Sequence, residues 1–223
     1  MLSAAGGTGA VRVHRGGLDV IAHYGSVAAE MAVCLKAVGL ADRSDLRVLE
    51  VTGEEPFLDH ALDAAVPGGV PQTGGAVCVA DTWCCRPADD RALVVGAPGA
   101  VDRWRSVIGR AAATTGIPVR ARSLPAADAL SIVGPRAAAV LDASALPSGL
   151  SADEVGAGAL AGSEVLVLRE RDGGYMLVFP AGCGPEAFEA LAQRGRVAGM
   201  AMVGHDALAR LRAAHVTAAA ALN

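Results

Sequence analysis

The chain has 223 residues, of which 52% are hydrophobic, 3% aromatic and 19% charged, and its formal net charge is −4. So apolar a chain buries enough surface to offset its conformational entropy, which excludes a disordered tail protein. The acidic excess and the lack of 18 uninterrupted apolar residues predict a cytoplasmic protein that binds neither nucleic acid nor membrane.

The N-terminal part of the chain predicts a loose end, a helix and a strand. Residues 1–16 show no periodicity and predict a flexible terminus ahead of a single folded unit, residues 17–223. Apolar positions at helical spacing follow Ser26, a good N-cap, and Gly39 stands where a C-cap would lie. The run 46–51 alternates apolar and polar residues, as a half-buried strand does.

The next segment predicts a second helix, a hairpin and a third helix. Thr52 and Glu55 have the spacing of a capping box ahead of the second helix. Two strand-like runs, 76–85 and 91–96, flank turn residues and predict a β-hairpin. A helix should then begin near Pro98 and end at Gly116.

The second part of the chain repeats this plan. The segment 130–147 has the strand, glycine and helix order of 49–67, and 174–195 echoes 91–112 at a similar offset. Two matches at nearly one offset indicate an internal duplication. We therefore predict an α+β fold with pseudo-duplicated antiparallel sheets and covering helices, made of two intertwined halves at about 40–120 and 121–223.

Three further segments complete the expected plan. The Gly- and Ala-rich run 144–163 predicts a long loop, and the charged run 169–172 before Gly173 predicts a hairpin turn. The last twenty residues, 204–223, have high helix propensity.

Few residues carry an obvious chemical signal. Five cysteines without a Cys-x-x-Cys pair predict free thiols and no metal site. Asp81 places a carboxylate in an apolar run beside Trp83, where burial would suit general acid or base work or the binding of a substrate amine. The alternative is that Asp81 is a strand-edge residue at the end of a loop.

Four short motifs, in order, carry a family resemblance. They are Gly-Leu-x-Asp-x-Ser at 39–44, Val-Thr-Gly at 51–53, Ala-Leu-x-x-x-Gly-Pro at 129–135 and the late Gly-to-Arg helix at 199–212. Together they resemble the folate-binding superfamily of glycine-cleavage T-proteins (aminomethyltransferases), YgfZ-type proteins and sarcosine oxidase gamma subunits. The resemblance implies a duplicated folate domain that lacks the C-terminal barrel of a full T-protein.

The resemblance also implies a cofactor and a site. Tetrahydrofolate would bind in the hole between the two halves, and an aminomethyl or other one-carbon transferase would act on a folate or amine substrate. Matching Asp-x-x-x-x-Arg to residues 81–86 makes Asp81 the acid. The other residues that the resemblance places near the folate are Tyr24, Trp83, Asp172, Tyr175 and Arg212.

Departures from the family pattern support a second hypothesis. The family's Gly-Gly-x-x-Asp-Asp loop is shortened, and Asp172 replaces the pterin-binding glutamate with one methylene less. These losses favour a catalytically inactive, folate-free accessory subunit similar to the sarcosine oxidase gamma subunit, with a partner subunit or as a homodimer. An unrelated α+β enzyme is the third alternative.

Overall fold

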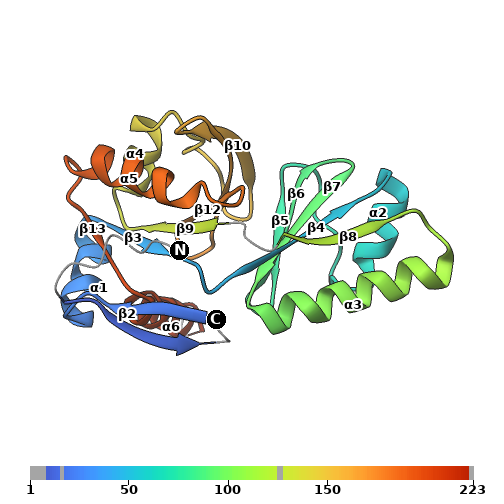
Figure 1. Cartoon of the computed structure of the whole chain (residues 1–223), viewed down its shortest axis with the longest axis horizontal. Coiled ribbons are helices and arrows are strands. Elements are labelled where there is room, and N and C mark those ends of the chain that lie inside the picture. Colours follow the sequence, from blue (N-terminus) through green and yellow to red (C-terminus); the bar gives the residue numbers. More distant parts are fainter. Residues whose placement is uncertain (1–8, 16–17, 125–127, 221–223) are drawn as a thin grey trace.

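The computed structural model describes residues 9–15, 18–124 and 128–220. Two halves lie side by side, and each is built on its own β-sheet with helices against one face (Figure 1). The α+β class is therefore confirmed. None of the helices in the described ranges has the length and hydropathy that a membrane span requires.

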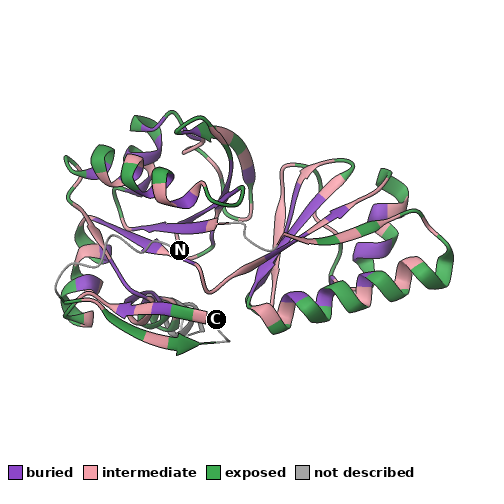
Figure 2. Ribbon diagram, viewed as in Figure 1, coloured by how far each residue is buried: buried purple, intermediate pink, exposed green. Residues whose placement is uncertain are grey.

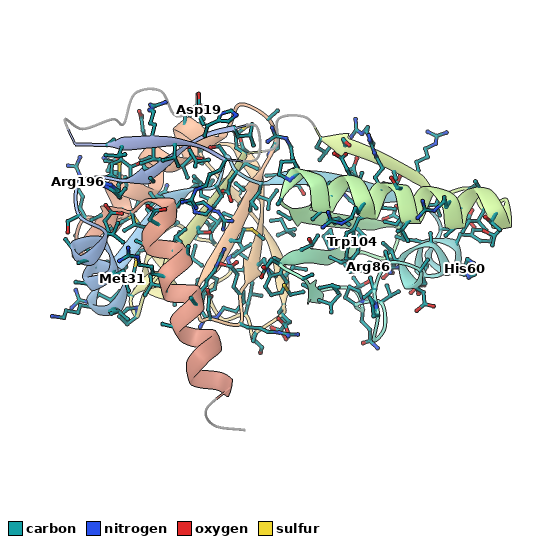
Figure 3. The ribbon with its side chains drawn as sticks, turned by 90° about the horizontal axis from the view of Figure 1, so that it is seen from below. Asp19, Met31, His60, Arg86, Trp104 and Arg196 are labelled. Atoms are coloured by element: carbon teal, nitrogen blue, oxygen red, sulfur yellow. The ribbon has the colours of Figure 1, made fainter. Side chains whose placement is uncertain are left out.

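The first half is an antiparallel sheet whose outer face is covered by two helices. In sheet order its strands are β5 (Ala76–Val79), β6 (Thr82–Ala88), β7 (Arg91–Gly96), β4 (Arg47–Thr52) and β8 (Arg120–Leu124). The helices are α2 (Glu55–Asp63) and α3 (Pro98–Thr115). Trp104 of α3 is buried against this sheet, while the opposite side of α3 is exposed (Figures 2 and 3).

The second half is a larger sheet with two helices of its own. In sheet order its strands are β10 (Val155–Leu160), β11 (Ser163–Arg169), β12 (Tyr175–Phe179), β9 (Asp128–Val133), β3 (Val38–Asp42) and β13 (Met200–Met202). The helices are α4 (Ala137–Ala143) and α5 (Gly184–Gly195). The strand pairs of this sheet are antiparallel, as expected, except at one edge, where β13 runs parallel to β3.

A terminal layer packs beside the second half. It contains the hairpin of β1 (Val11–Arg15) and β2 (Leu18–His23), α1 (Val27–Lys36) and α6 (His205–Ala220). Helix α6 contacts both α1 and β2, so the two ends of the described chain lie together. Figure 3 shows that the last turns of α6 extend past the rest of this half.

The duplication is visible in the order of the elements. The series β4, α2, β5–β6–β7, α3, β8 is matched by β9, α4, β10–β11–β12, α5, β13. Even the first hairpin turns correspond, since Ala80-Asp81 and Ala161-Gly162 all have positive φ, as type I′ turns require. The pseudo-duplicated fold is therefore confirmed.

The inner faces of the two sheets pack together in a core of their own. Trp83, Leu93 and Val95 of the first sheet belong to one buried cluster with Leu166 and Val178 of the second. At their edges the sheets also share backbone hydrogen bonds, one of which joins the Val155 amide to the Gly74 carbonyl at 2.8 Å. The halves are therefore joined by both apolar contact and hydrogen bonding.

The boundaries of the first elements differ from those expected. Residues 11–15 of the expected flexible terminus pair as β1, while residues 1–8 and 16 lie outside the described residues. Helix α1 does begin after the Ser26 cap but ends at Lys36. Gly39 lies in β3, where a Cβ would come 2.5 Å from the Cys34 sulfur, so this glycine allows close packing instead of ending a helix.

Two other expectations need correction for physical reasons. Thr52 does not cap α2, because it belongs to β4; the N-cap is Glu54, with no side-chain hydrogen bond. The expected loop 144–163 contains β10. Its glycines have low strand propensity, so the sequence does not indicate a strand. They are needed there because a Cβ on Gly158 would come 2.9 Å from Leu146.

Candidate functional site

A cavity of about 330 Å³ opens between the two sheets. Its volume lies within the range of small-molecule sites, about 300–1,000 Å³. Most of its walls are apolar, and four charged side chains stand among them. The lining residues are Glu50, Pro87, Arg91, Leu93, Arg122, Leu124, Ala157, Glu164, Val165, Leu166, Val178, Phe179, Pro180 and Ala181.

Strand register gathers the charges of the first sheet on its inner face. Glu50 of β4 pairs with Arg122 of β8. Thr52, two residues farther along β4, pairs with Arg91 of β7 on one side and with Arg120 of β8 on the other. Residues directly opposite each other share a face of an antiparallel sheet, and so do residues two apart on a strand. One end of this face is thus apolar and packed on the second sheet, and the other end is polar.

Glu50 is held by two arginines. Arg91 donates from Nε to Oε1 at 3.0 Å, and Arg122 donates from Nη2 to Oε2 at 2.7 Å. The Arg122 hydrogen bond, together with the charges of both arginines, outweighs burial and lowers the pKa of Glu50. Glu50 is therefore an ionised carboxylate at neutral pH, and it is poorly suited to act as an acid.

The wall formed by the second sheet carries one negative charge, that of Glu164. Glu164 of β11 is exposed, and within the described part of the chain its carboxylate makes no hydrogen bond or ion pair. Leu166, Val178 and Phe179 lie on the same side of the cavity. A ligand with an apolar body, a hydrogen-bond donor edge and an acidic end would find a suitable partner for each part.

Asp81 does not occupy the position expected for a buried acid. The expected strand 76–85 is interrupted at Ala80 and Asp81, which form the exposed turn between β5 and β6, with φ of 47° and 61°. Asp81 also does not line the cavity between the sheets. The physical reason is that the polar side chain marks a hairpin turn and not the middle of a strand.

Trp83 lies close to the cavity walls without lining the cavity. It is 9% exposed and packs in the inter-sheet core, together with the lining residues Leu93, Leu166 and Val178. It cannot offer an open face to a ligand in this position. Its fluorescence should nevertheless respond to changes in the cavity.

Asp172 and Arg212 are brought together, at a second place in the molecule. Arg212 of α6 donates to Glu170 Oε1 at 2.7 Å, and its Nε lies 3.5 Å from Asp172 Oδ2. The charges of Glu170 and Asp172 outweigh burial and raise the pKa of Arg212, whereas burial raises that of Glu170. The second oxygen of Glu170 is buried without a hydrogen-bond partner. This cluster fixes α6 to the turn between β11 and β12.

Tyr24 and Tyr175 both contact residues of the surrounding fold. Tyr175 is 2% exposed, donates from its hydroxyl to the Ser148 carbonyl at 2.5 Å and packs under Arg169. Tyr24 follows β2, and its backbone amide donates to Glu30 at 2.6 Å. Burial, followed by the charges of Asp42 and Glu30, raises the pKa of Tyr24 to about 12. Neither tyrosine lines the cavity between the sheets.

Thiol and metal chemistry find little support in the described residues. All five cysteines are free, and burial raises the pKa of Cys34 to about 11 and that of Cys84 to about 12. Such thiols carry almost no thiolate at neutral pH. Within the described ranges, no group of three or more His, Cys, Asp or Glu residues could hold a metal ion.

Sequence reasoning missed the charged residues of the cavity. Glu50, Arg91 and Arg122 each belong to a strand of the first half, and each is a polar residue on the face that otherwise forms the inter-sheet core. The available signal was the polar positions of the alternating run 46–51. That signal could not show which strands would place their polar residues beside Glu50.

A family model decides the relationship of the chain to known proteins. The model described as "GCVT N-terminal domain" matches residues 1–219. The chain belongs to this family. The GCVT N-terminal domain is aminomethyltransferase-like, and the expected resemblance is therefore confirmed.

Two solved structures share the fold of this chain. The glycine cleavage system aminomethyltransferase T from Bartonella henselae is 22% identical, with a TM-score of 0.72 over 89% of this chain. This GCVT-domain chain covers only 57% of that protein's length. A chain of the heterotetrameric sarcosine oxidase from Corynebacterium sp. U-96 is 20% identical, with a TM-score of 0.60. Here the match covers 78% of this chain and 93% of the other. No curated protein matches the chain.

Proposed function

We propose that this GCVT-domain protein binds a tetrahydrofolate-like ligand in the cavity between its two sheets. The cavity itself carries the proposal, because its apolar walls, arginines and free carboxylate suit the flat body, acidic end and amino edge of a folate. Membership of the family supports the choice of ligand. Free, buried thiols agree with a reducing compartment, so we place the protein in the cytoplasm.

The residues that line the cavity suit the binding of a ligand. Of the two glutamates in the cavity lining, Glu50 is bound to two arginines and Glu164 is exposed. Asp81 lies on an exposed turn outside that lining. Tetrahydrofolate, when bound, would supply the one-carbon unit, and the chain's own residues would hold it and exclude water.

Thermal unfolding with tetrahydrofolate tests the proposal. A ligand that binds only the native state raises Tm, and at one hundred times Kd the gain is about 2.7 kcal/mol. We expect a rise in Tm with millimolar tetrahydrofolate and a change in Trp83 fluorescence, measured in a Trp104→Phe background. If Tm and fluorescence both stay unchanged, the proposal is wrong.

A second function, that of a folate-free accessory subunit, is favoured by a different observation. The carboxylates of Glu170, Asp172 and Glu50 are all engaged by arginines, as in structural ion pairs, and among the described residues of the cavity lining this leaves the exposed Glu164 as the carboxylate without a partner. The sarcosine oxidase chain with this fold comes from a heterotetramer and is matched over 93% of its length. Native purification separates the two functions, because a stable hetero-oligomer without folate supports only the accessory one.

A further inference from the structure

Strand β8 leaves one edge of the first sheet open. The edges of β5 and β10 are joined to each other, since the Ala76 amide donates to the Asp153 carbonyl at 2.6 Å. The second sheet ends in β13, which has only three residues and is contacted by α1. Strand β8 instead pairs regularly with β4 over all five of its residues, and within the described ranges no backbone hydrogen bond occupies its other side. Unpaired amides and carbonyls in such a row can pair with a further strand.

Comparison of the two halves shows where a further strand would fit. In the first half, β8 follows β4 in the sheet and is its last strand. In the second half, β9 and β13 are the counterparts of β4 and β8, but β3 lies between them and pairs with both. The second sheet therefore includes a strand from outside its own repeat, and among the described residues it has six strands where the first has five. A strand added beside β8 would give the first sheet the same number.

Positive charge surrounds the open edge of β8. The segment 98–124, which includes α3 and β8, contains five arginines and one aspartate, although the whole chain has a net charge of −4. Arg120 is exposed on the face that β8 turns toward the second sheet. Arg105 of α3 lies on the other face, where it donates to the Ser123 hydroxyl at 3.4 Å, and 52% of its side chain is exposed beside Asp102 (Figure 1). An added strand would thus have an arginine on each of its faces.

An acidic strand suits this edge better than the alternatives. Exposed arginines commonly protect an edge strand from pairing with copies of itself. Two β8 edges from two copies of this chain would bring Arg120 and Arg122 of each copy close together, and like charges on neighbouring strands are destabilising. The same repulsion excludes a basic strand, whereas carboxylates are attracted. A nucleic acid would meet the same charges but would leave the amides and carbonyls of β8 unpaired.

We infer that the open edge of β8 is a docking site for an extended, acidic segment of a partner protein, which adds a sixth strand to the first sheet. The partner's backbone pairs with β8, and its carboxylates lie near Arg105 and Arg120. The inference rests on the accessory-subunit function only in requiring a partner. It is independent of folate binding, because neither Arg105 nor Arg120 lines the cavity.

The test uses a blocked peptide, Val-Glu-Glu-Val-Glu-Glu-Val, which as a strand has glutamates on both faces. We expect calorimetry at low salt to show saturable binding to the full chain. The double variant Arg105→Glu/Arg120→Glu should bind the peptide about tenfold more weakly. The matched control is Arg103→Glu/Arg110→Glu, which makes the same change in charge at two other exposed arginines of α3 and should bind like the wild type. The Tm of each variant shows whether it is folded.

Amide hydrogen exchange separates strand addition from simple attraction between charges. The amides of β8 that point away from β4 gain backbone partners when a strand is added. Their exchange, measured within residues 120–124, should therefore slow by about tenfold at saturating peptide. Binding of the peptide without this protection would overturn the addition of a strand to β8.

The other outcomes each decide a separate point. Equal affinity for the peptide with lysine in place of glutamate, or equal weakening in both double variants, overturns recognition of an acidic strand at this edge. An oligouridylate that binds in place of the peptide overturns a protein partner. Protection of 120–124 that rises with the concentration of the free chain shows pairing of two copies, which also overturns it. If the peptide does not bind but native purification gives a hetero-oligomer, the docking site fails and the accessory function stands.

Discussion

At the residue scale, Ala80 and Asp81 show how a single turn changes the interpretation of a carboxylate. Both have positive φ and connect β5 to β6, where the corresponding turn in the second half has Gly162 at its second position. Residues other than glycine pay a conformational cost in this region. The position of Asp81 is thus explained by hairpin geometry and requires no catalytic role.

The positive φ of Asp81 predicts that Asp81→Gly stabilises the protein. The φ of 61° suits glycine, so we expect the free energy of unfolding to rise by about 0.5–1 kcal/mol, offset in part by the greater entropy of the unfolded chain. Urea unfolding measures the change, and calorimetry should find tetrahydrofolate affinity within twofold of the wild type. A large loss of affinity would instead return Asp81 to the site.

A second prediction concerns the pH dependence of Glu50. Because its pKa is lowered in the folded state, mainly by Arg122, the stability that it contributes is present above the unfolded value of 4.5 and is lost as pH falls through the folded pKa. The variant Glu50→Gln should cost about 0.5–1 kcal/mol at pH 7. The difference from the wild type in urea unfolding should shrink below pH 4.5. A difference that is constant from pH 7 to pH 3 would contradict the ion pairs.

Residue patterns in the sequence indicate where a strand lies, but they do not indicate which other strands pair with it. The run 46–51 correctly predicted a strand, but β4 is buried on both faces and not on one, since Val48 lies in the inter-sheet core and Leu49 and Val51 pack on the helix side. Glu50 of β4 lines the cavity. The arginines that bind Glu50 lie 41 and 72 positions away in the sequence, and only the pairing of β4 with both β7 and β8 brings them together. Non-local pairing of this kind leaves no local signal.

At the element scale, α6 is attached by charge as well as by apolar contact. Leu208 and Leu211 pack with Cys34 and Val133, while Arg212 binds the buried Glu170. The charged turn expected at 169–172 does join β11 and β12, but Glu170 within it is only 4% exposed. The burial of Glu170 has no local signal in the sequence, because its partner Arg212 lies 42 residues later.

Arg212→Ala should therefore destabilise the protein strongly. Removal of the guanidinium leaves Glu170 buried without its partner, which typically costs about 3–5 kcal/mol. Arg210→Ala is the matched control, because Arg210 lies on the same helix and is exposed. Thermal and urea unfolding of the two variants provide the comparison. Equal effects would show that the ion pair does not hold α6.

Most elements follow from local patterns, and those that were missed have physical reasons. The Ser26 cap of α1 and the Gly116 cap of α3 were correctly predicted, because capping is a local property. The sequence does not predict strand β10, because glycine has low strand propensity. The glycines are required by close contacts with Leu146 and Pro147, which leave no room for a Cβ. Tertiary packing decides such segments.

At the scale of the whole molecule, the duplication creates the candidate site. Two copies of one plan place their inner faces together, and the apolar ends of these faces form a shared core. The polar end of the first sheet is left beside the open part of the interface, where the cavity lies. The repeat was readable from sequence and predicted the two halves, and the family resemblance implied a site between them, but neither identified the residues that line the cavity.

The most direct test of this account is tetrahydrofolate binding to two variants of β10. Ala157 lines the cavity, whereas Ala159, two residues along the same strand and likewise exposed, does not. We predict by calorimetry that Ala157→Phe, which fills the cavity, weakens binding at least tenfold, and that Ala159→Phe binds like the wild type. Binding that is equal in the wild type and both variants, or absent from the wild type, would contradict a folate site between the two sheets.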